Sequence, residues 1–400
     1  MPPRTLRPGV TWVGAIDWHR RLFDEIIPLP DGTSYNSYLV EGKEKNALID
    51  AVDPRTEREL VANLDALKVK NIDYVVANHA EQDHSGAIPK VLEMYPGASV
   101  VTNHRCMEML RHLLHIPEDR FMIVNDRDIL HLGGRTLEFL YAPWVHWPET
   151  MFTYLREDKI LFTCDFLGAH LATSDLYATD EPTVFEAAKR YYAEIMMPFR
   201  THIQKHLALI RGMEFDIIAP SHGPIYNRPE FILKAYEDWA GDAVKNEVVV
   251  AYVSMHGSTK VMAEHLTSAL MTRGVGVRLF DLTVTDIGEL AKSLVDCATL
   301  VIAAPAVLGG PHPSALYAAY LVRALKPKLR FLGIVGSYGW GSRMLEDLKG
   351  IVGSLSAELF EPVIVKGLPG SEDLKRMEIL AEEIAKRHDD LRIIQETAVR

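Results

Sequence analysis

The first half of the chain alternates short apolar runs with stretches of helical periodicity. Each run holds three to six residues, and runs of this length bounded by turn residues are typical of strands. Many short strands with helices between them indicate a layered α/β sandwich. The runs are Thr11–Ile16, Ser37–Val40, Ala47–Ile49, Tyr74–Ala77 and Leu137–Tyr141.

The pattern changes near residue 245. Apolar residues recur at helical spacing between Ile232 and Trp239, which predicts an amphipathic helix. The polar stretch 241–246 that follows has the composition of a linker. We therefore predict a first domain over residues 1–245 and a second over residues 246–400.

Strand, loop and helix repeat through the second half. The run Glu247–Val253 does not alternate with polar residues, as expected of a parallel strand that is buried on both faces. A helical pattern follows it and ends at Gly274, a residue type that favours a helix C-terminus. Two further runs, Thr299–Ala304 and Phe331–Val335, also lead into glycine-containing loops. This repetition predicts a doubly wound parallel sheet.

Composition excludes several classes of protein. Lys and Arg number 43 against 54 Asp and Glu, a net charge of −11, which argues against nucleic-acid binding. No apolar stretch is long enough for a membrane helix, and no signal-peptide pattern is visible, so we expect a cytoplasmic protein that does not bind membranes. The 3 cysteines form no C-x-x-C pair, which argues against a disulfide framework or a cysteine-based metal module.

Four apolar runs of the first half lead directly, or after a few residues, into histidine or aspartate. We expect these side chains to meet at one edge of a sheet, which is how a preorganised metal site is built. The run at Tyr74–Ala77 precedes Asn78-His79-Ala80-Glu81-Gln82-Asp83-His84, Leu137–Tyr141 precedes His146, Lys159–Thr163 precedes Cys164-Asp165, and Phe215–Ala219 precedes Ser221-His222-Gly223.

A single histidine after a strand is most often an ordinary loop residue. The segment from His79 to His84 is different, because it places four ionisable side chains within six residues. Such crowding causes repulsion and desolvation costs unless a cation neutralises the group. The sequence therefore predicts a metal site here.

The pattern His-x-Glu-x-Asp-His, with a later His, Asp and Ser-His-Gly, resembles the metallo-β-lactamase fold. Within that fold, Glu81 in place of a second histidine resembles the flavodiiron proteins, which suits iron better than zinc. The resemblance implies two non-haem iron ions. It assigns His79, Glu81 and His146 to one iron, Asp83, His84 and His222 to the other, and Asp165 to both as a bridge. In some family members the residue that matches His84 does not coordinate iron.

Three loops of the second half resemble the flavodoxin loops that bind FMN. The first lies between a buried strand and a helix N-terminus, where backbone N–H groups and hydroxyls can hold a phosphate. Taken alone, such a loop is usually only a helix cap, and the other two loops, at the carboxyl ends of strands, strengthen the interpretation. The residues are Ser254, Met255, His256, Gly257, Ser258 and Thr259; Pro305, Ala306, Val307, Leu308, Gly309 and Gly310; and Ser337, Tyr338, Gly339, Trp340 and Gly341.

Two departures from the family pattern stand out. Relatives often carry Ser-Pro-Thr-x-Asn in the second loop, whereas this chain has Ala306 and Leu308 at the two polar positions, so FMN would depend more on backbone groups. Many members also have His-Gly where this chain has Asp24-Glu25. We expect the first departure to affect the flavin potential and the second to affect proton delivery or the choice of gas.

The resemblance spans the chain and implies an oxidoreductase of sandwich-plus-flavodoxin architecture. Its expected reaction is reduction of dioxygen to water, or of nitric oxide to nitrous oxide, at the iron pair. FMN would supply the electrons to the irons. Electrons would come from an external donor such as rubredoxin or a reduced deazaflavin coenzyme. Relatives form a head-to-tail homodimer that brings the FMN of one subunit to the irons of the other, so we expect such a dimer or a dimer of dimers.

Two other classes remain open from the residues. One is a zinc hydrolase of the metallo-β-lactamase fold that carries a flavodoxin-like appendage. The other is a flavodoxin-like electron carrier whose first domain has lost its metal ions. Glu81 and the flavin loops argue against the first class, and the complete set of metal-ligating residues argues against the second.

Overall fold

The computed structural model describes residues 1–393. The chain forms two compact units: residues 1–192 with 199–240, and residues 193–198 with the chain from residue 241 onward. No helix among residues 1–393 combines the length and the apolar character that crossing a membrane requires.

The first unit contains two packed β-sheets. Large apolar side chains such as Trp12, Tyr38, Phe139 and Phe162 fill the space between them. The seven-stranded sheet has the order β1 (Arg4–Arg7), β2 (Val10–Trp12), β7 (Tyr38–Glu41), β8 (Asn46–Ile49), β9 (Tyr74–Val76), β10 (Ser99–Thr102) and β11 (Phe121–Ile123). The five-stranded sheet has the order β12 (Ile129–His131), β13 (Thr136–Tyr141), β14 (Met151–Leu155), β15 (Ile160–Cys164) and β16 (Ile217–Pro220).

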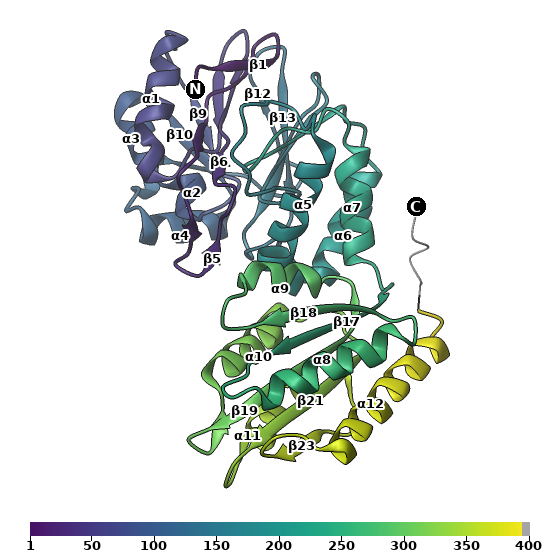
Figure 1. Cartoon of the computed structure of the whole chain (residues 1–400). Coiled ribbons are helices and arrows are strands. Elements are labelled where there is room, and N and C mark those ends of the chain that lie inside the picture. The colour runs from purple at the N-terminus through teal and green to yellow at the C-terminus, as the bar shows by residue number, and fades with distance from the viewer. Residues whose placement is uncertain (394–400) are drawn as a thin grey trace. The chain divides into compact units, whose positions relative to one another are not determined.

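Helices cover the outer faces of this pair of sheets, as Figure 1 shows. One set packs on the seven-stranded sheet and the other on the five-stranded sheet, which confirms the predicted αβ/βα sandwich. The first set is α1 (Glu57–Ala66), α2 (Gln82–Ser85), α3 (Ile88–Met94) and α4 (His104–Leu113), and the second is α5 (Glu181–Tyr191), α6 (Arg200–Arg211) and α7 (Glu230–Ala240).

The single strand predicted at Thr11–Ile16 is wrong in one respect, because the run divides between two sheets. Its first part belongs to β2, and its last part forms β3 (Ala15–Asp17), which pairs with β6 (Thr33–Tyr35). The division falls at Gly14, where a Cβ atom would lie 2.2 Å from the Tyr35 carbonyl oxygen. Only glycine allows the chain to cross at that distance. A second small hairpin, β4 (Leu22–Phe23) with β5 (Ile27–Pro28), follows.

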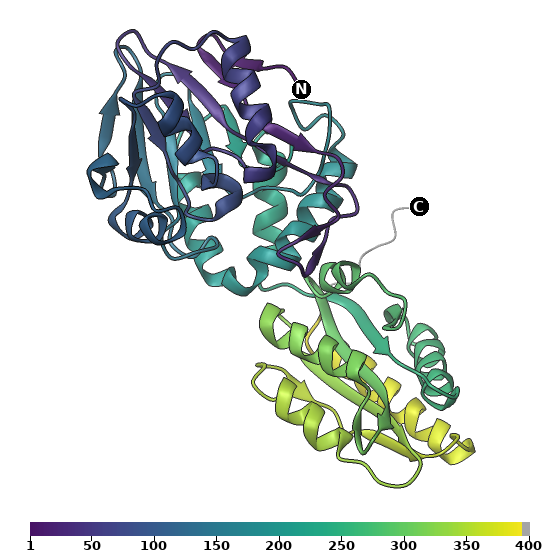
Figure 2. The same cartoon turned by 90° about the vertical axis from the view of Figure 1, so that its left-hand side faces the viewer.

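The second unit is a parallel sheet with helices on both faces, as predicted (Figure 2). The order 2-1-3-4-5 along the sheet is that of flavodoxin-like folds. The strands are β18 (Gly276–Asp281), β17 (Lys245–Tyr252), β19 (Cys297–Val307), β21 (Phe331–Tyr338) and, at the far edge, β22 (Glu358–Leu359) and β23 (Val363–Lys366). The helices are α8 (Ser258–Met271) and α12 (Ser371–Asp390) on one face, and α9 (Ile287–Ser293), α10 (Pro313–Leu325) and α11 (Met344–Val352) on the other.

Two strands of this sheet extend beyond the runs that predicted them. β19 continues to Val307 and then turns back as β20 (Gly310–Pro311) through Leu308 and Gly309. β21 continues to Tyr338 because its last residues pair with β23. β21 is extended by pairing with a strand that is distant in the sequence, and β19 by a hairpin that forms only on folding. The local sequence pattern records neither partner.

A buried histidine fastens α12 to the sheet and makes the second unit sensitive to acid. His388 Nε2 lies 2.7 Å from Thr299 Oγ1, and His388 Nδ1 lies 2.8 Å from Asn246 Oδ1. Burial lowers the pKa of His388 to about 4. The unfolded chain, with an ordinary histidine pKa of 6.5, therefore binds this proton more readily than the folded chain does.

We expect the free energy of unfolding of this unit to fall by about 2 kcal/mol as the pH drops from 7 to 4, because protonation of His388 favours the unfolded state below its ordinary pKa. Urea unfolding of wild type and His388→Gln at several pH values measures the effect. The variant should lose this part of the pH dependence, and parallel pH profiles for the two proteins would contradict the prediction.

Candidate functional site

Four loops bring titratable side chains together in the first unit. His79 and Glu81 follow β9, Asp83 and His84 lie in α2, and His146 lies between β13 and β14. Asp165 follows β15, and His222 follows β16. β9 belongs to the seven-stranded sheet, whereas β13, β14, β15 and β16 belong to the five-stranded sheet, so the expectation of one sheet edge is wrong. The site lies where the ends of two sheets meet.

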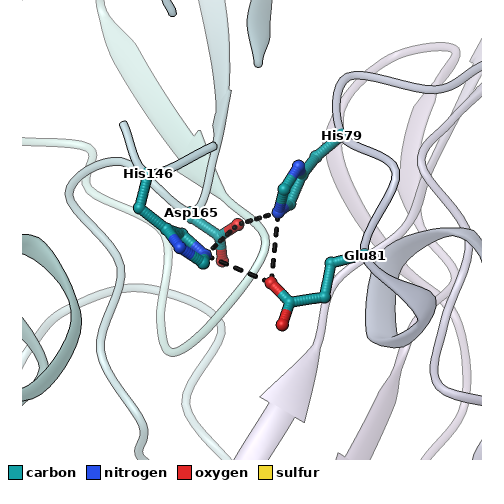
Figure 3. A group of neighbouring side chains, drawn as sticks. All are labelled: His79, Glu81, His146 and Asp165. Atoms are coloured by element: carbon teal, nitrogen blue, oxygen red, sulfur yellow. Dashed lines mark hydrogen bonds and ion pairs between the residues drawn. The ribbon is translucent and has the colours of Figure 1, made fainter. Parts of the chain in front are cut away.

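Four of these side chains point toward one another in Figure 3. Glu81 Oε2 lies 3.1 Å from both His79 Nε2 and His146 Nε2. Asp165 Oδ2 lies 3.4 Å from His79 Nε2 and 3.6 Å from His146 Nε2. Two nitrogens and two oxygens thus surround one point, and their mutual distances do not exceed 4.8 Å.

A second set of three residues meets on the other side of Asp165. Asp83 Oδ2 lies 3.1 Å from His222 Nε2, and Asp83 Oδ1 lies 3.3 Å from His84 Nε2. Asp165 Oδ1 lies 3.0 Å from His84 Nε2 and 3.3 Å from His222 Nε2. One oxygen of Asp165 therefore faces each set, so that a single buried carboxylate lies between them.

The second set contains buried polar atoms whose bonding capacity is not met by hydrogen bonds, as expected of metal-ligating atoms. Both carboxylate oxygens of Asp83 and both ring nitrogens of His84 are buried and form no hydrogen bond of good geometry among residues 1–393, although Asp83 faces His84 and His222 at ion-pair distance. Buried polar groups without partners are rare in folded proteins and cost free energy. A metal ion that these atoms ligate would remove that cost, so the residues fit the ion that the sequence pattern implies.

Strong electrostatic coupling holds the cluster together. Burial raises the pKa of Asp165, but the charge of His84 and hydrogen bonds from His146 and His222 outweigh burial and hold that pKa well below its usual value. Burial lowers the pKa of His146 and His222, but close contacts with Asp165 and with a second carboxylate, Glu81 for His146 and Asp83 for His222, raise them to about 9 and about 10. The ligand-free cluster is thus a network of imidazolium and carboxylate groups, and metal binding must release protons from it.

Local hydrogen bonds fix the loops that carry the cluster. Ser85 Oγ donates to the Ala80 carbonyl oxygen at 2.7 Å, which closes the turn around His84. Gly223 follows His222 with φ +77°, and a Cβ there would lie 2.6 Å from the Ala169 carbonyl oxygen. Glycine at this position is therefore required by both backbone conformation and space.

Aromatic rings enclose the second set. The ring centroid of His170 lies 4.7 Å from that of His222, and Tyr35 and Tyr191 lie 5.8 and 5.9 Å from it. Burial and then the charge of His222 lower the pKa of His170 well below its usual value, so His170 is a neutral imidazole beside the cluster.

Tyr191 also bonds directly to the cluster, since its hydroxyl donates to Asp165 Oδ1 at 2.8 Å. We expect Tyr191→Phe to lower metal affinity about tenfold, because a hydrogen bond to a charged group contributes roughly 1.5–3 kcal/mol. Iron content after dialysis against a graded chelator measures the change. Tyr192→Phe is the matched control, because the buried Tyr192 hydroxyl has no hydrogen-bond partner among residues 1–393. Equal iron loss from the two variants would contradict the prediction.

Asp24 lies in the exposed hairpin between β4 and β5. Partial burial, and then the charges of Glu81 and Asp83, raise the pKa of its carboxyl group to about 6. Its neighbour Phe23 packs against His170 and His222 at centroid distances of 5.2 and 6.5 Å. The departure noted at this position is therefore electrostatically linked to the cluster.

A pocket of about 400 Å³ lies at the carboxyl ends of the strands of the second unit. Eleven of the residues that the sequence predicted for FMN line this pocket, and Gly367, which was not predicted, lines it as well. The eleven are Ser254, Met255, His256, Ser258, Thr259, Pro305, Ala306, Ser337, Tyr338, Gly339 and Trp340. Gly257 and Gly341 are not among its lining residues, and Val307, Leu308, Gly309 and Gly310 form the β19–β20 hairpin instead.

The start of α8 has the features of a phosphate site. Gly257 precedes the helix with φ +91° and open space around the position of a Cβ. Of the first turn, Lys260 N donates to Ser254 Oγ at 3.2 Å, and the N-cap glycine itself offers no side-chain acceptor. Backbone N–H groups at a helix N-terminus have no partner within the helix and favour anions. Thr259 Oγ1 lies 2.9 Å from Ser337 Oγ and so connects the first loop with the third. These donors fit the phosphate group of FMN.

Sequence reasoning missed two buried acids that hold the loop of His79. Asp50 Oδ1 accepts a hydrogen bond from Asn78 N at 2.8 Å, and Glu149 Oε1 lies 2.6 Å from His79 Nδ1. The available signal for Glu149 was its position three residues after His146. An acid so near a histidine in a short loop is a candidate partner for a metal-ligating imidazole.

Comparison with known proteins adds to this geometry. A family model described as ODP family beta lactamase matches residues 33–223. The chain is 36% identical to a nitric oxide reductase of Moorella thermoacetica, over 97% of this chain and 99% of that protein. It is similar to the rubredoxin oxygen:oxidoreductase of Desulfovibrio gigas, with a TM-score of 0.93, 27% identity and coverage of 97% and 99%. It also resembles the flavodiiron protein of Giardia intestinalis, with a TM-score of 0.91, 30% identity and coverage of 98% and 97%.

Proposed function

The chain belongs to the flavodiiron protein family, whose members are oxidoreductases, and we propose that it reduces dioxygen to water, nitric oxide to nitrous oxide, or both. The observation that carries the proposal is the position of Asp165. Its two oxygens face two separate sets of nitrogen and oxygen atoms, an arrangement that suits a pair of metal ions.

We assign each residue of the cluster a role in holding that pair. Imidazole nitrogens mixed with carboxylate oxygens suit iron in redox work. His79, Glu81 and His146 would hold one iron, Asp83, His84 and His222 the other, and Asp165 would bridge them. Bound iron would supply electrons and Lewis acidity to the gas, and FMN in the pocket of the second unit would deliver electrons from a donor.

The protein itself must bind the gas, exclude water and move protons. Reduction of dioxygen to two water molecules consumes four electrons and four protons, and reduction of two nitric oxide molecules to nitrous oxide and water consumes two of each. The rings of Tyr35, Tyr191 and His170 exclude water beside His222. Asp24, whose carboxyl pKa is raised to about 6, can hold a proton at its carboxylate near neutral pH and release it toward the cluster.

The proposal extends to partners. An external donor such as rubredoxin or a reduced deazaflavin coenzyme would reduce FMN. A head-to-tail homodimer, or a dimer of such dimers, would place the flavin of one subunit near the irons of the other. The domain boundary near residue 245 and a cytoplasmic location stay predictions. Sedimentation velocity tests the oligomer, and a monomer with fast internal electron transfer would contradict it.

Reoxidation kinetics test the activity. The iron- and FMN-loaded protein is reduced chemically without air and then mixed with dioxygen or with nitric oxide. We expect fast reoxidation by at least one gas, and His79→Asn should abolish it because one metal position loses a ligand. A loaded protein that neither gas reoxidises would overturn the proposal and favour a zinc hydrolase, for which zinc-loaded protein and ester substrates supply the assay.

A further inference from the structure

A buried carboxylate outside the ligand set lies directly behind His79. Glu149 Oε1 lies 2.6 Å from His79 Nδ1, on the side of the ring opposite the cluster, and it also accepts a hydrogen bond from Ala80 N at 3.1 Å. The side chains of Glu149 and His79 are both completely shielded from solvent. The second oxygen, Oε2, is buried with no hydrogen-bond partner among residues 1–393. Glu149 therefore directs its charge mainly at His79 and its loop.

Other histidines of the cluster have different groups behind them. His222 Nδ1 donates to the Ser34 carbonyl oxygen at 2.7 Å, a neutral acceptor. His84 Nδ1 is buried and has no hydrogen-bond partner within the described part of the chain. The set that contains His79 thus has a buried negative charge behind one of its imidazoles, whereas the set that contains His84 and His222 has a carbonyl group and an unpaired nitrogen.

Glu149 is itself held firmly. Asn103 Nδ2 donates to the Glu149 carbonyl oxygen at 2.6 Å, while Asn103 Oδ1 accepts from Cys106 N and caps α4. Glu149 lies three residues after His146, so one residue connects the loop of His146 with the ring of His79. Both of these histidines belong to the same set.

We propose that Glu149 is a positioning residue that makes the two metal positions electronically unequal. By accepting the Nδ1 proton of His79 it presents Nε2 to the metal, and a carboxylate behind an imidazole increases the basicity of that ligand. A buried negative charge also favours the more highly charged ion, because electrostatic interactions are stronger away from water. The iron at His79, Glu81 and His146 would thus have the lower midpoint potential of the pair. It would stay ferric while its neighbour is reduced. This inference rests on the proposed iron pair.

Asp50→Asn provides a matched control for Glu149→Gln. Asp50 is a buried acid that follows β8 and contacts the loop of His79, because it accepts hydrogen bonds from Asn78 N at 2.8 Å and from Asn78 Nδ2 at 2.9 Å. Both substitutions replace a buried carboxyl group by an amide of the same shape, but Asp50 interacts more strongly with the charge of His84, in the other set, than with that of His79. Only Glu149 bonds to the ring of a predicted ligand, so a purely structural effect should appear in both variants.

The test is a redox titration of iron-loaded protein, followed by the electron paramagnetic resonance signal of the half-reduced pair. In wild type, unequal positions should yield a large half-reduced population. In Glu149→Gln we expect the equilibrium constant that favours this population to fall about tenfold, a shift of about 59 mV in one midpoint potential. Glu149→Asp retains the charge and should restore part of the separation. Asp50→Asn should not reduce the separation, because the charge that interacts most strongly with Asp50 is that of His84, in the other set.

Each outcome has a distinct meaning. Equal half-reduced populations in wild type and Glu149→Gln, with two irons bound in each, would overturn the role of Glu149 and leave the proposed function intact. Equal losses in Glu149→Gln and Asp50→Asn would also overturn it, because they would indicate loop disruption. A wild-type protein that binds no iron under reconstitution would overturn the proposed function itself. If Glu149→Gln does not fold, the comparison of Glu149→Asp with Asp50→Asn decides the question.

Discussion

Replacing Asp165 by Asn should empty both metal positions at once. The four imidazole nitrogens that lie 3.0–3.6 Å from its carboxylate belong to both sets of proposed ligands. An amide offers one weakly ligating oxygen in place of two anionic ones, so neither position retains its charge balance. We expect affinity for both irons to fall on the order of 100-fold or more, since changes even beyond the ligands cost 10–100-fold, and reoxidation by dioxygen or nitric oxide should disappear.

Glu81→Gln is the control that separates a bridging residue from an ordinary ligand. Glu81 contacts only His79 and His146 within the cluster, so its loss should weaken one position more than the other. Iron content and the absorbance of bound FMN are measured for both variants. A protein with Asn at position 165 that retains two irons would contradict the bridging role, and flavin loss from that variant would indicate general unfolding.

The clustering of the proposed ligand residues could be predicted because each follows an apolar run in a chain region with a clear strand pattern. The end of an apolar run marks the end of a buried strand. The polar or charged residues that follow the run can therefore be placed at that end from the sequence alone. The pairing of strands was not visible in this way. β9 and β15 end beside the same cluster but belong to different sheets, because partner choice depends on contacts between distant residues that no local period records.

The residues that support the ligands were harder to predict for a related reason. Asp50 and Glu149 are acids that the sequence alone cannot distinguish from exposed loop residues. Their function depends on burial against Asn78 and His79, which only the folded chain reveals. Similarly, Leu308 was predicted for the flavin loop, yet it is 96% exposed at the tip of the β19–β20 hairpin. Its contact with FMN stays a prediction.

Introducing a carboxylate at the start of α8 should remove FMN and leave the metal pair in place. Ser258 is the first residue of that helix and lines the pocket. Ser258→Asp places a negative charge where the phosphate is expected, and two like charges a few ångströms apart near a protein surface repel by about 4 kcal/mol. We therefore expect the dissociation constant for FMN to rise about 100-fold or more.

In Ser258→Asp, repulsion of the phosphate can be distinguished from a loss of helix stability. Aspartate in the first turn of a helix is favourable, since it interacts with the positive end of the helix dipole. Flavin-free Ser258→Asp should therefore unfold no more easily than flavin-free wild type, and a loss of FMN then reports repulsion at the site. Ser268→Asp lies in the same helix, is exposed and is remote from the pocket, so it should retain FMN.

Flavin fluorescence titration measures the affinity for FMN, and iron analysis measures the metal content of each variant. If the two cofactors bind independently, Ser258→Asp should contain the wild-type amount of iron and still be reoxidised by gas after chemical reduction of the irons. Turnover with a protein or coenzyme donor should fail, because electrons from such a donor would enter through FMN. Unchanged FMN affinity in Ser258→Asp would place the phosphate elsewhere, and loss of iron together with FMN would mean that the two units depend on each other for cofactor binding.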